Sequence, residues 1–69
     1  MKRLNDISRL TSALYFAQQR HDVELIKAYL LDFRPPQEVE FEYLNIMKGL
    51  NQYNYSEKVE KVVDLLANM

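Results

Sequence analysis

Few side chains in this sequence are of the types that carry out catalysis or bind metals. His21 is the single histidine, and Asp22 and Glu24 follow it closely enough for a three-ligand metal site to be considered. Three residues within one helical turn do not converge on one ion, however, as ligands four residues apart do. A histidine in a turn or at a helix cap is therefore the favoured interpretation of His21.

Two pairs of carboxylates have the spacing that places them side by side on a helix. They are Glu38 with Glu42, and Glu60 with Asp64. Such a pair can act in general acid–base catalysis, but a solvated helix face explains the spacing adequately. The chain has no cysteine, no glycine-rich phosphate loop and no nucleophile placed beside a base. We therefore predict no enzymatic activity, no metal, no cofactor and no small-molecule substrate.

The length and composition describe one small folded domain, residues 1–69. A chain of 69 residues, 48% hydrophobic and with a net charge of -1, can bury one modest core. The absence of cysteine excludes a disulfide or zinc-cysteine scaffold. The longest apolar runs are too short to span a bilayer, and no export signal is found. We expect a protein of the reducing cytoplasm with no membrane partner.

The spacing of the apolar residues predicts four helices, because these residues recur at steps of three and four. Asn5 and Asp22 are suited to cap the first two helices, and Asn54, with a glutamate three residues later, has the spacing of a capping box. Pro35 and Pro36 must end the second helix by residue 33. Short turns then require sequential helices to pack antiparallel. The predicted helices are 5–20, 22–33, 36–52 and 55–67, as two hairpins of about 5–33 and 36–67.

The segment that leads into the third helix also fits a β-strand. Residues 38–43 alternate between glutamate and apolar side chains. An isolated strand would leave its backbone groups unpaired, and the apolar stripe continues at helical spacing, so we prefer the helix. Pro36 would then stand in its first turn. Gly49 would lie inside the helix, where it would allow a neighbouring helix to approach closely.

Charged residues are divided unevenly between the halves of the chain. Residues 1–34 carry six basic and four acidic side chains, a net of +2, whereas residues 35–69 carry three basic and six acidic ones, a net of -3. This pattern could orient two subunits or steer a partner, and a solvated surface also accounts for it. A small transcriptional regulator or nucleic-acid-binding protein is the alternative function. The recognition helix of a helix-turn-helix protein, however, should present polar and basic residues to the DNA groove, where this chain has Leu25, Tyr29 and Leu31.

The two halves of the chain resemble each other at a separation of 33 residues. Residues n and n + 33 are both apolar at the pairs Leu10 and Tyr43, Ala13 and Ile46, Leu14 and Met47, Ala17 and Leu50, Ile26 and Val59, Leu30 and Val63, and Phe33 and Leu66. The chain therefore looks like two helical hairpins of one length, neither of which buries its apolar face alone.

This layout of helix, short turn, helix, proline-marked break and next helix resembles the tetratricopeptide (TPR) repeat. The resemblance covers nearly the whole chain and is one of pattern. An unrelated four-helix arrangement is the alternative. The resemblance implies a module that binds peptides or helices on a concave surface, and small TPR-like bacterial proteins also act as chaperones for secreted or self-assembling subunits. Two repeats are fewer than usually stand alone, so dimerisation or docking onto a partner is implied as well.

The second predicted helix gives the clearest indication of a partner. Eight of the eleven residues of 23–33 are apolar, and Leu25, Tyr29 and Leu31 lie off the stripe that faces the core. Such a helix is either central or covered by another molecule. Tyr15 also lies off the main stripes, and aromatic residues of this kind are enriched at interfaces. We therefore predict an all-α chaperone, adaptor or regulator that binds a protein partner or a second copy through these four residues.

Overall fold

The structure, a computed structural model, describes residues 7–68, so the predicted cap at Asn5 lies outside the described residues. The helices are α1 (Ile7–Gln19), α2 (Val23–Asp32), the 3-10 helix η1 (Gln37–Val39), α3 (Glu40–Met47) and α4 (Tyr55–Ala67). Between residues 7 and 68 there is no β-strand, which confirms the all-α class and the helical interpretation of residues 38–43. None of the helices in this range is long and apolar enough to cross a bilayer.

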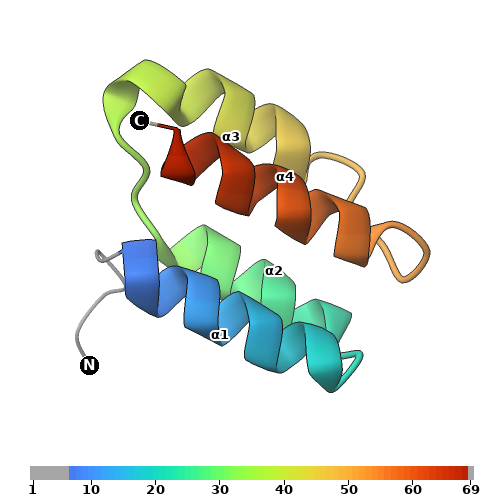
Figure 1. Ribbon diagram of the computed structural model, residues 1–69. Coiled ribbons are helices and arrows are strands. Elements are labelled where there is room, and N and C mark those ends of the chain that lie inside the picture. Colours follow the sequence, from blue (N-terminus) through green and yellow to red (C-terminus); the bar gives the residue numbers. More distant parts are fainter. Residues whose placement is uncertain (1–6, 69) are drawn as a thin grey trace.

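Sequential helices pack antiparallel in two hairpins, α1 with α2 and α3 with α4 (Figure 1). The hairpins meet where α1 packs against α4, whereas the backbones of α2 and α3 scarcely approach each other. One side of the bundle is therefore closed by helix packing, and the opposite side, between α2 and α3, is open. Over residues 7–68 this arrangement gives no evidence for a TPR-like repeat.

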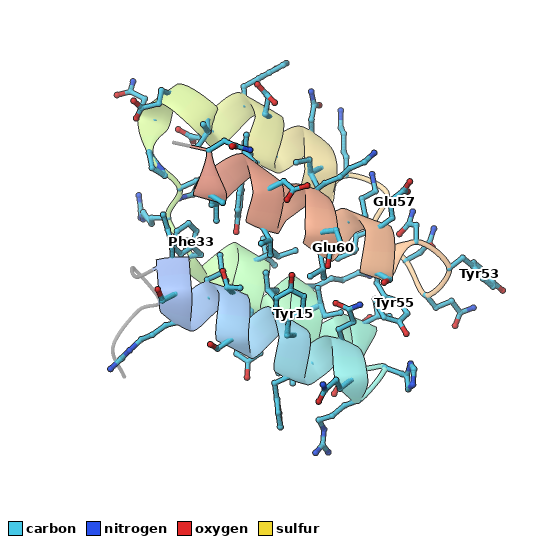
Figure 2. All side chains as sticks on the ribbon, viewed as in Figure 1. Tyr15, Phe33, Tyr53, Tyr55, Glu57 and Glu60 are labelled. Atoms are coloured by element: carbon cyan, nitrogen blue, oxygen red, sulfur yellow. The ribbon has the colours of Figure 1, made fainter. Side chains whose placement is uncertain are left out.

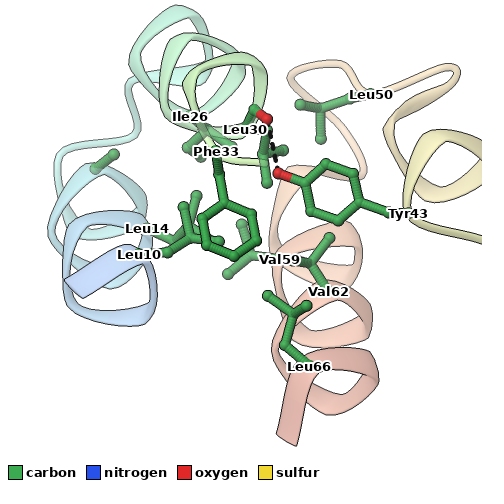
Figure 3. Packing of buried hydrophobic residues seen from close by; sticks show 11 residues of the cluster. Leu10, Leu14, Ile26, Leu30, Phe33, Tyr43, Leu50, Val59, Val62 and Leu66 are labelled. Atoms are coloured by element: carbon green, nitrogen blue, oxygen red, sulfur yellow. Dashed lines mark hydrogen bonds between the residues drawn. The ribbon is translucent and has the colours of Figure 1, made fainter. Parts of the chain in front are cut away.

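One apolar cluster joins the two hairpins. Its buried members come from all four helices and from the two connections that flank α3 (Figure 3): Leu10, Leu14, Ala17, Ile26, Leu30, Phe33, Tyr43, Leu50, Val59, Val62 and Leu66. Because each hairpin supplies part of a single core, neither hairpin has a core of its own.

The turn between α1 and α2 is held by a cap at each helix end. His21 has a φ of 56°, and its N–H donates to the Gln18 carbonyl (3.0 Å), while the Asp22 N–H donates to the Ala17 carbonyl (3.1 Å). These two bonds form a Schellman motif, which closes the end of α1. The Asp22 carboxylate then accepts the Leu25 N–H (3.1 Å) at the start of α2. The predictions of a turn histidine and of an Asp22 cap are confirmed.

The two prolines end α2 as predicted, and the last carbonyls of that helix, that of Leu30 among them, have no helical partner. Arg34 precedes Pro35 and is disfavoured from the helical conformation, so its N–H does not return to the Leu30 carbonyl. That carbonyl instead accepts the hydroxyl of Tyr43 at 2.6 Å (Figure 3). This buried bond links α3 to α2 across the open side of the bundle.

The third helix is shorter than predicted at both ends. Pro36 lies outside it, as the residue before η1, and the helix ends at Met47 rather than near residue 52. Lys48 is extended and Gly49 has a φ of 77°, and the Leu50 N–H donates to the Met47 carbonyl (3.1 Å), which makes a type II turn. A Cβ on Gly49 would meet nothing within 4 Å. The glycine therefore serves its own backbone conformation, and the predicted close approach of a helix is wrong.

The predicted capping box at Asn54 is also wrong. The Asn54 Oδ1 accepts the Asn51 N–H (2.8 Å), and its Nδ2 donates to the Gly49 carbonyl (2.9 Å). The Asn51 Oδ1 in turn accepts the N–H groups of Tyr53 and Asn54. Both asparagine side chains thus stabilise the loop, and the side chain of Asn54 does not cap α4.

Candidate functional site

A row of polar contacts runs along the packed side of the bundle, where α1 meets α4. The pairs are Tyr15 with Glu60 (3.1 Å), Gln18 with Ser56 (2.8 Å) and His21 with Tyr55 (2.6 Å). Figure 2 shows Tyr15 reaching from α1 toward Glu60 on α4. Desolvation and then the hydrogen bond from its hydroxyl to the Glu60 carboxylate raise the pKa of Tyr15. This row, here called the polar seam, joins the first hairpin to α4 at the surface.

The described acidic residues are not grouped in a way that would hold a metal ion. Glu38, Glu42 and Asp64 line a groove between α3 and α4, where Lys61 lies among them, and all four are exposed. Within residues 7–68 no group of three histidine, cysteine or acidic side chains is placed to hold a metal ion. These carboxylates are thus solvated and have no buried site in which to exchange protons.

The structure separates the four residues predicted to form an interface. Leu25 and Tyr29 are half-buried and pack against the core cluster. Tyr15 is 37% exposed and belongs to the polar seam. Leu31 is 74% exposed and lies on the side of α2 that faces α3. The four residues therefore do not share one surface, and only Leu31 lies at the open side of the bundle.

An open groove follows this side between α2 and α3. It is lined by Leu30, Leu31, Phe33, Arg34, Pro35, Glu40, Tyr43, Leu44 and Met47, and is called here the α2–α3 groove. Leu44 is 52% exposed, and Phe41, one turn earlier on α3, is 77% exposed. Leu31 and Leu44 thus present exposed apolar surface in one groove, and Phe41 adds exposed apolar surface beside the lining residues Glu40 and Leu44. Apolar surface of this kind is characteristic of an interaction site.

Phe41 and Leu44 were not predicted as site residues. The apolar stripe of the third predicted helix runs through Tyr43, and Phe41 and Leu44 lie outside this stripe. The signal that indicated Leu31, an apolar side chain off the buried stripe of its helix, also applies to them. Two such residues three apart on one helix are neighbours, so the pattern was available in the sequence.

Comparison of the chain with protein-family models, with curated proteins and with solved structures finds no match. Its function is therefore inferred from the α2–α3 groove and from the residues that line it.

Proposed function

We propose that this protein is a small non-enzymatic interaction module, acting as a chaperone, adaptor or regulator, that binds another polypeptide in the α2–α3 groove. The observation that carries the proposal is the exposure of Leu31 and Leu44 in the groove, with the exposed Phe41 beside Leu44 on α3. Complete burial of each such side chain favours association by roughly 1.5–3 kcal/mol before the entropic cost of binding is met. Three of them are enough for a weak and reversible complex.

The form of the groove favours a helix as the bound segment. Its walls are two antiparallel helices whose backbones stand apart, so a further helix could lie between them and contact both. Tyr43 and Met47 lie among its lining residues. Methionine adapts its shape to different partners, and this suits a site that receives side chains from outside.

The charges around the groove favour a protein partner over nucleic acid. Arg34 and Glu40 are its charged lining residues, so the two charges cancel. A surface that binds phosphates needs an excess of basic groups. We place this module in the reducing cytoplasm, which suits a chain without cysteine.

Photo-crosslinking in the cells of origin tests the proposal. We expect benzoylphenylalanine at position 41 to form an adduct with a polypeptide, and we expect Leu31→Glu in the same chain to abolish it by placing a charge in the groove. Position 41 lies beside the lining residues Glu40 and Leu44. The matched control is benzoylphenylalanine at position 53, because Tyr53 is 87% exposed in the loop before α4 and lines a different pocket, with Arg20 and Val23.

Circular dichroism of the Leu31→Glu chain checks that the helices persist. The proposal is wrong if position 41 gives no adduct, if Leu31→Glu leaves the adduct unchanged in a folded chain, or if position 53 gives the same adduct in the same yield.

A further inference from the structure

We infer that the polypeptide bound in the α2–α3 groove is a second copy of this chain, related to the first by a two-fold axis that runs along the groove. The inference rests on the proposed function of the groove and names its occupant. It is carried by the way in which the charged and apolar residues are distributed on the two walls.

The charges of the groove are self-complementary. Arg34 follows the end of α2 on one side of the groove, Glu40 begins α3 on the other side, and both are exposed. Neither makes an ion pair or a side-chain hydrogen bond with another described residue. A two-fold interface uses the same surface twice, so each charge on one wall must meet its opposite on the other wall. One arginine and one glutamate on opposite walls meet this condition.

The positions of these charges along the groove also agree with this symmetry. α2 and α3 are antiparallel and are joined by residues 33–39, so Arg34 and Glu40 both lie at the linker end of the groove (Figure 1). A two-fold axis along the groove places α2 of one copy over α3 of the other and keeps their linker ends together. Arg34 of each copy then faces Glu40 of the other, and two ion pairs form.

The apolar residues follow the same register. Leu31 lies about one turn from Arg34, away from the linker end, and Leu44 lies about one turn from Glu40 in the same direction. The axis that pairs the charges therefore also brings Leu31 of one copy against Leu44 of the other. The expected interface therefore contains two contacts between Leu31 and Leu44 and two ion pairs between Arg34 and Glu40. Protein interfaces commonly have an apolar core and a polar rim of this kind.

The size and net charge of the protein permit this dimer. A specific interface needs about 500 Å² from each copy, which is roughly one tenth of the 4928 Å² that the chain exposes. The net charge is -1, so two copies repel each other weakly. The edge ion pairs are expected to select the partner and its orientation more than to strengthen binding.

A charge-swap experiment by sedimentation equilibrium tests the inference. We expect the wild-type chain to dimerise and both Arg34→Glu and Glu40→Arg to weaken the dimer at least tenfold, because each variant opposes like charges twice. An equimolar mixture of the two variants should associate, since every pair across the axis is then attractive. The double variant Arg34→Glu with Glu40→Arg should dimerise by itself for the same reason.

The matched control is Glu57→Arg, an exposed charge reversal on α4 outside the groove, which should leave the dimer unchanged. Circular dichroism of each variant confirms folding, and the mixture provides a gain of association that an unfolded chain could not give. The inference is overturned if both charge reversals leave the dimer dissociation constant unchanged, or if the two single variants stay monomeric when they are mixed.

The inference and the proposed function fail in distinguishable ways. An adduct from position 41 with twice the mass of the chain supports both. A wild-type chain that is monomeric up to about 1 mM, with an adduct of different mass, overturns the second copy and leaves the interaction module intact. No adduct of any mass overturns the proposed function and, with it, the occupant.

Discussion

Tyr43 combines two contributions that few residue types can provide together. Its ring packs in the core, with a centroid 6.0 Å from that of Phe33. Its hydroxyl donates a hydrogen bond to the Leu30 carbonyl, which has no helical partner. A phenylalanine at this position would fill the same space but would leave the carbonyl buried without a donor. Buried polar groups without partners are costly, so the hydroxyl is a structural requirement of the open side.

Replacing this hydroxyl should weaken the fold. We expect Tyr43→Phe to lower the free energy of unfolding by about 1–2 kcal/mol, measured by urea denaturation followed by circular dichroism. Tyr53→Phe is the matched control, since the side chain of Tyr53 is exposed, and it should change the stability very little. Equal effects of the two substitutions would show that the bond to Leu30 contributes nothing.

Alkaline pH should destabilise the protein through the same residue. Burial raises the pKa of Tyr43, whereas in the unfolded chain the group ionises at its ordinary pKa of about 10. The unfolded state therefore loses this proton first, so the stabilisation is complete below about pH 10 and declines as the pH rises further. We expect the loss of stability between about pH 9 and 11 to be shallower in Tyr43→Phe than in the wild type. Parallel curves for the two proteins would contradict this expectation.

At the scale of the elements, the end of α3 depends on one backbone conformation. Gly49 occupies the third position of the type II turn with a φ of 77°, which residues with a Cβ rarely adopt. The turn reverses the chain after a helix of only two turns and delivers Leu50 to the core. Replacement of the glycine therefore strains the connection between α3 and α4.

We expect Gly49→Ala to lower the free energy of unfolding by about 1 kcal/mol, measured by thermal or urea denaturation. Lys48→Ala is its control, because Lys48 is exposed and has a φ of -60° that alanine adopts freely. A chain of this length can also be made by chemical synthesis, and D-alanine at position 49 should restore the stability because it favours positive φ. A D-alanine chain as unstable as the L-alanine one would exclude backbone strain as the cause.

The number of helices and their order could be predicted from the sequence because apolar spacing, caps and prolines act locally. The end of α3 could not, since Leu50 continues the helical stripe although a turn brings it into the core. The capping box predicted at Asn54 was wrong for a similar reason. The side chain of this residue binds Gly49 and Asn51 in the preceding loop, and the competition between these partners and α4 is settled only by the folded loop.

The candidate site was predictable in part. Composition correctly placed exposed apolar surface on α2 at Leu31, but it could not tell which neighbour that surface faces. The answer depends on the packing of α1 against α4, where the contacts, such as that of Tyr15 with Glu60, join residues as far as 45 positions apart in the sequence. No local pattern reports such a contact, so Leu44 could not be assigned to the same groove as Leu31 before the fold was known.

At the scale of the whole molecule, the two hairpins share one core and should unfold together. We expect Leu14→Ala, which removes a fully buried side chain of α1, to lower the free energy of unfolding by about 2–5 kcal/mol. Amide hydrogen exchange should then show loss of protection in α3 and α4 as well as in α1 and α2. In a chain this small, such a loss is a large part of the total stability.

Leu31→Ala is the matched control for this experiment, measured at a concentration at which the protein is monomeric. Its side chain is exposed in the groove, so the stability of the monomer should hardly change. If Leu14→Ala left α3 and α4 fully protected, the hairpins would be independent units and the single shared core would be refuted.

The two sides of the bundle differ in the number of hydrogen bonds that join the hairpins, and this difference determines where the bundle opens first. Two hydrogen bonds join α1 to α4 and a third joins the turn after α1 to α4, whereas among residues 7–68 α2 and α3 are joined by the bond from the Tyr43 hydroxyl to the Leu30 carbonyl. Thermal opening should therefore begin between α2 and α3. The two hairpins would rotate apart about the contact between α1 and α4, which would act as the hinge. This motion would break the Tyr43 bond and expose Phe33 and Leu50. The opened α2–α3 groove would then accept a larger side chain or segment than the closed groove does.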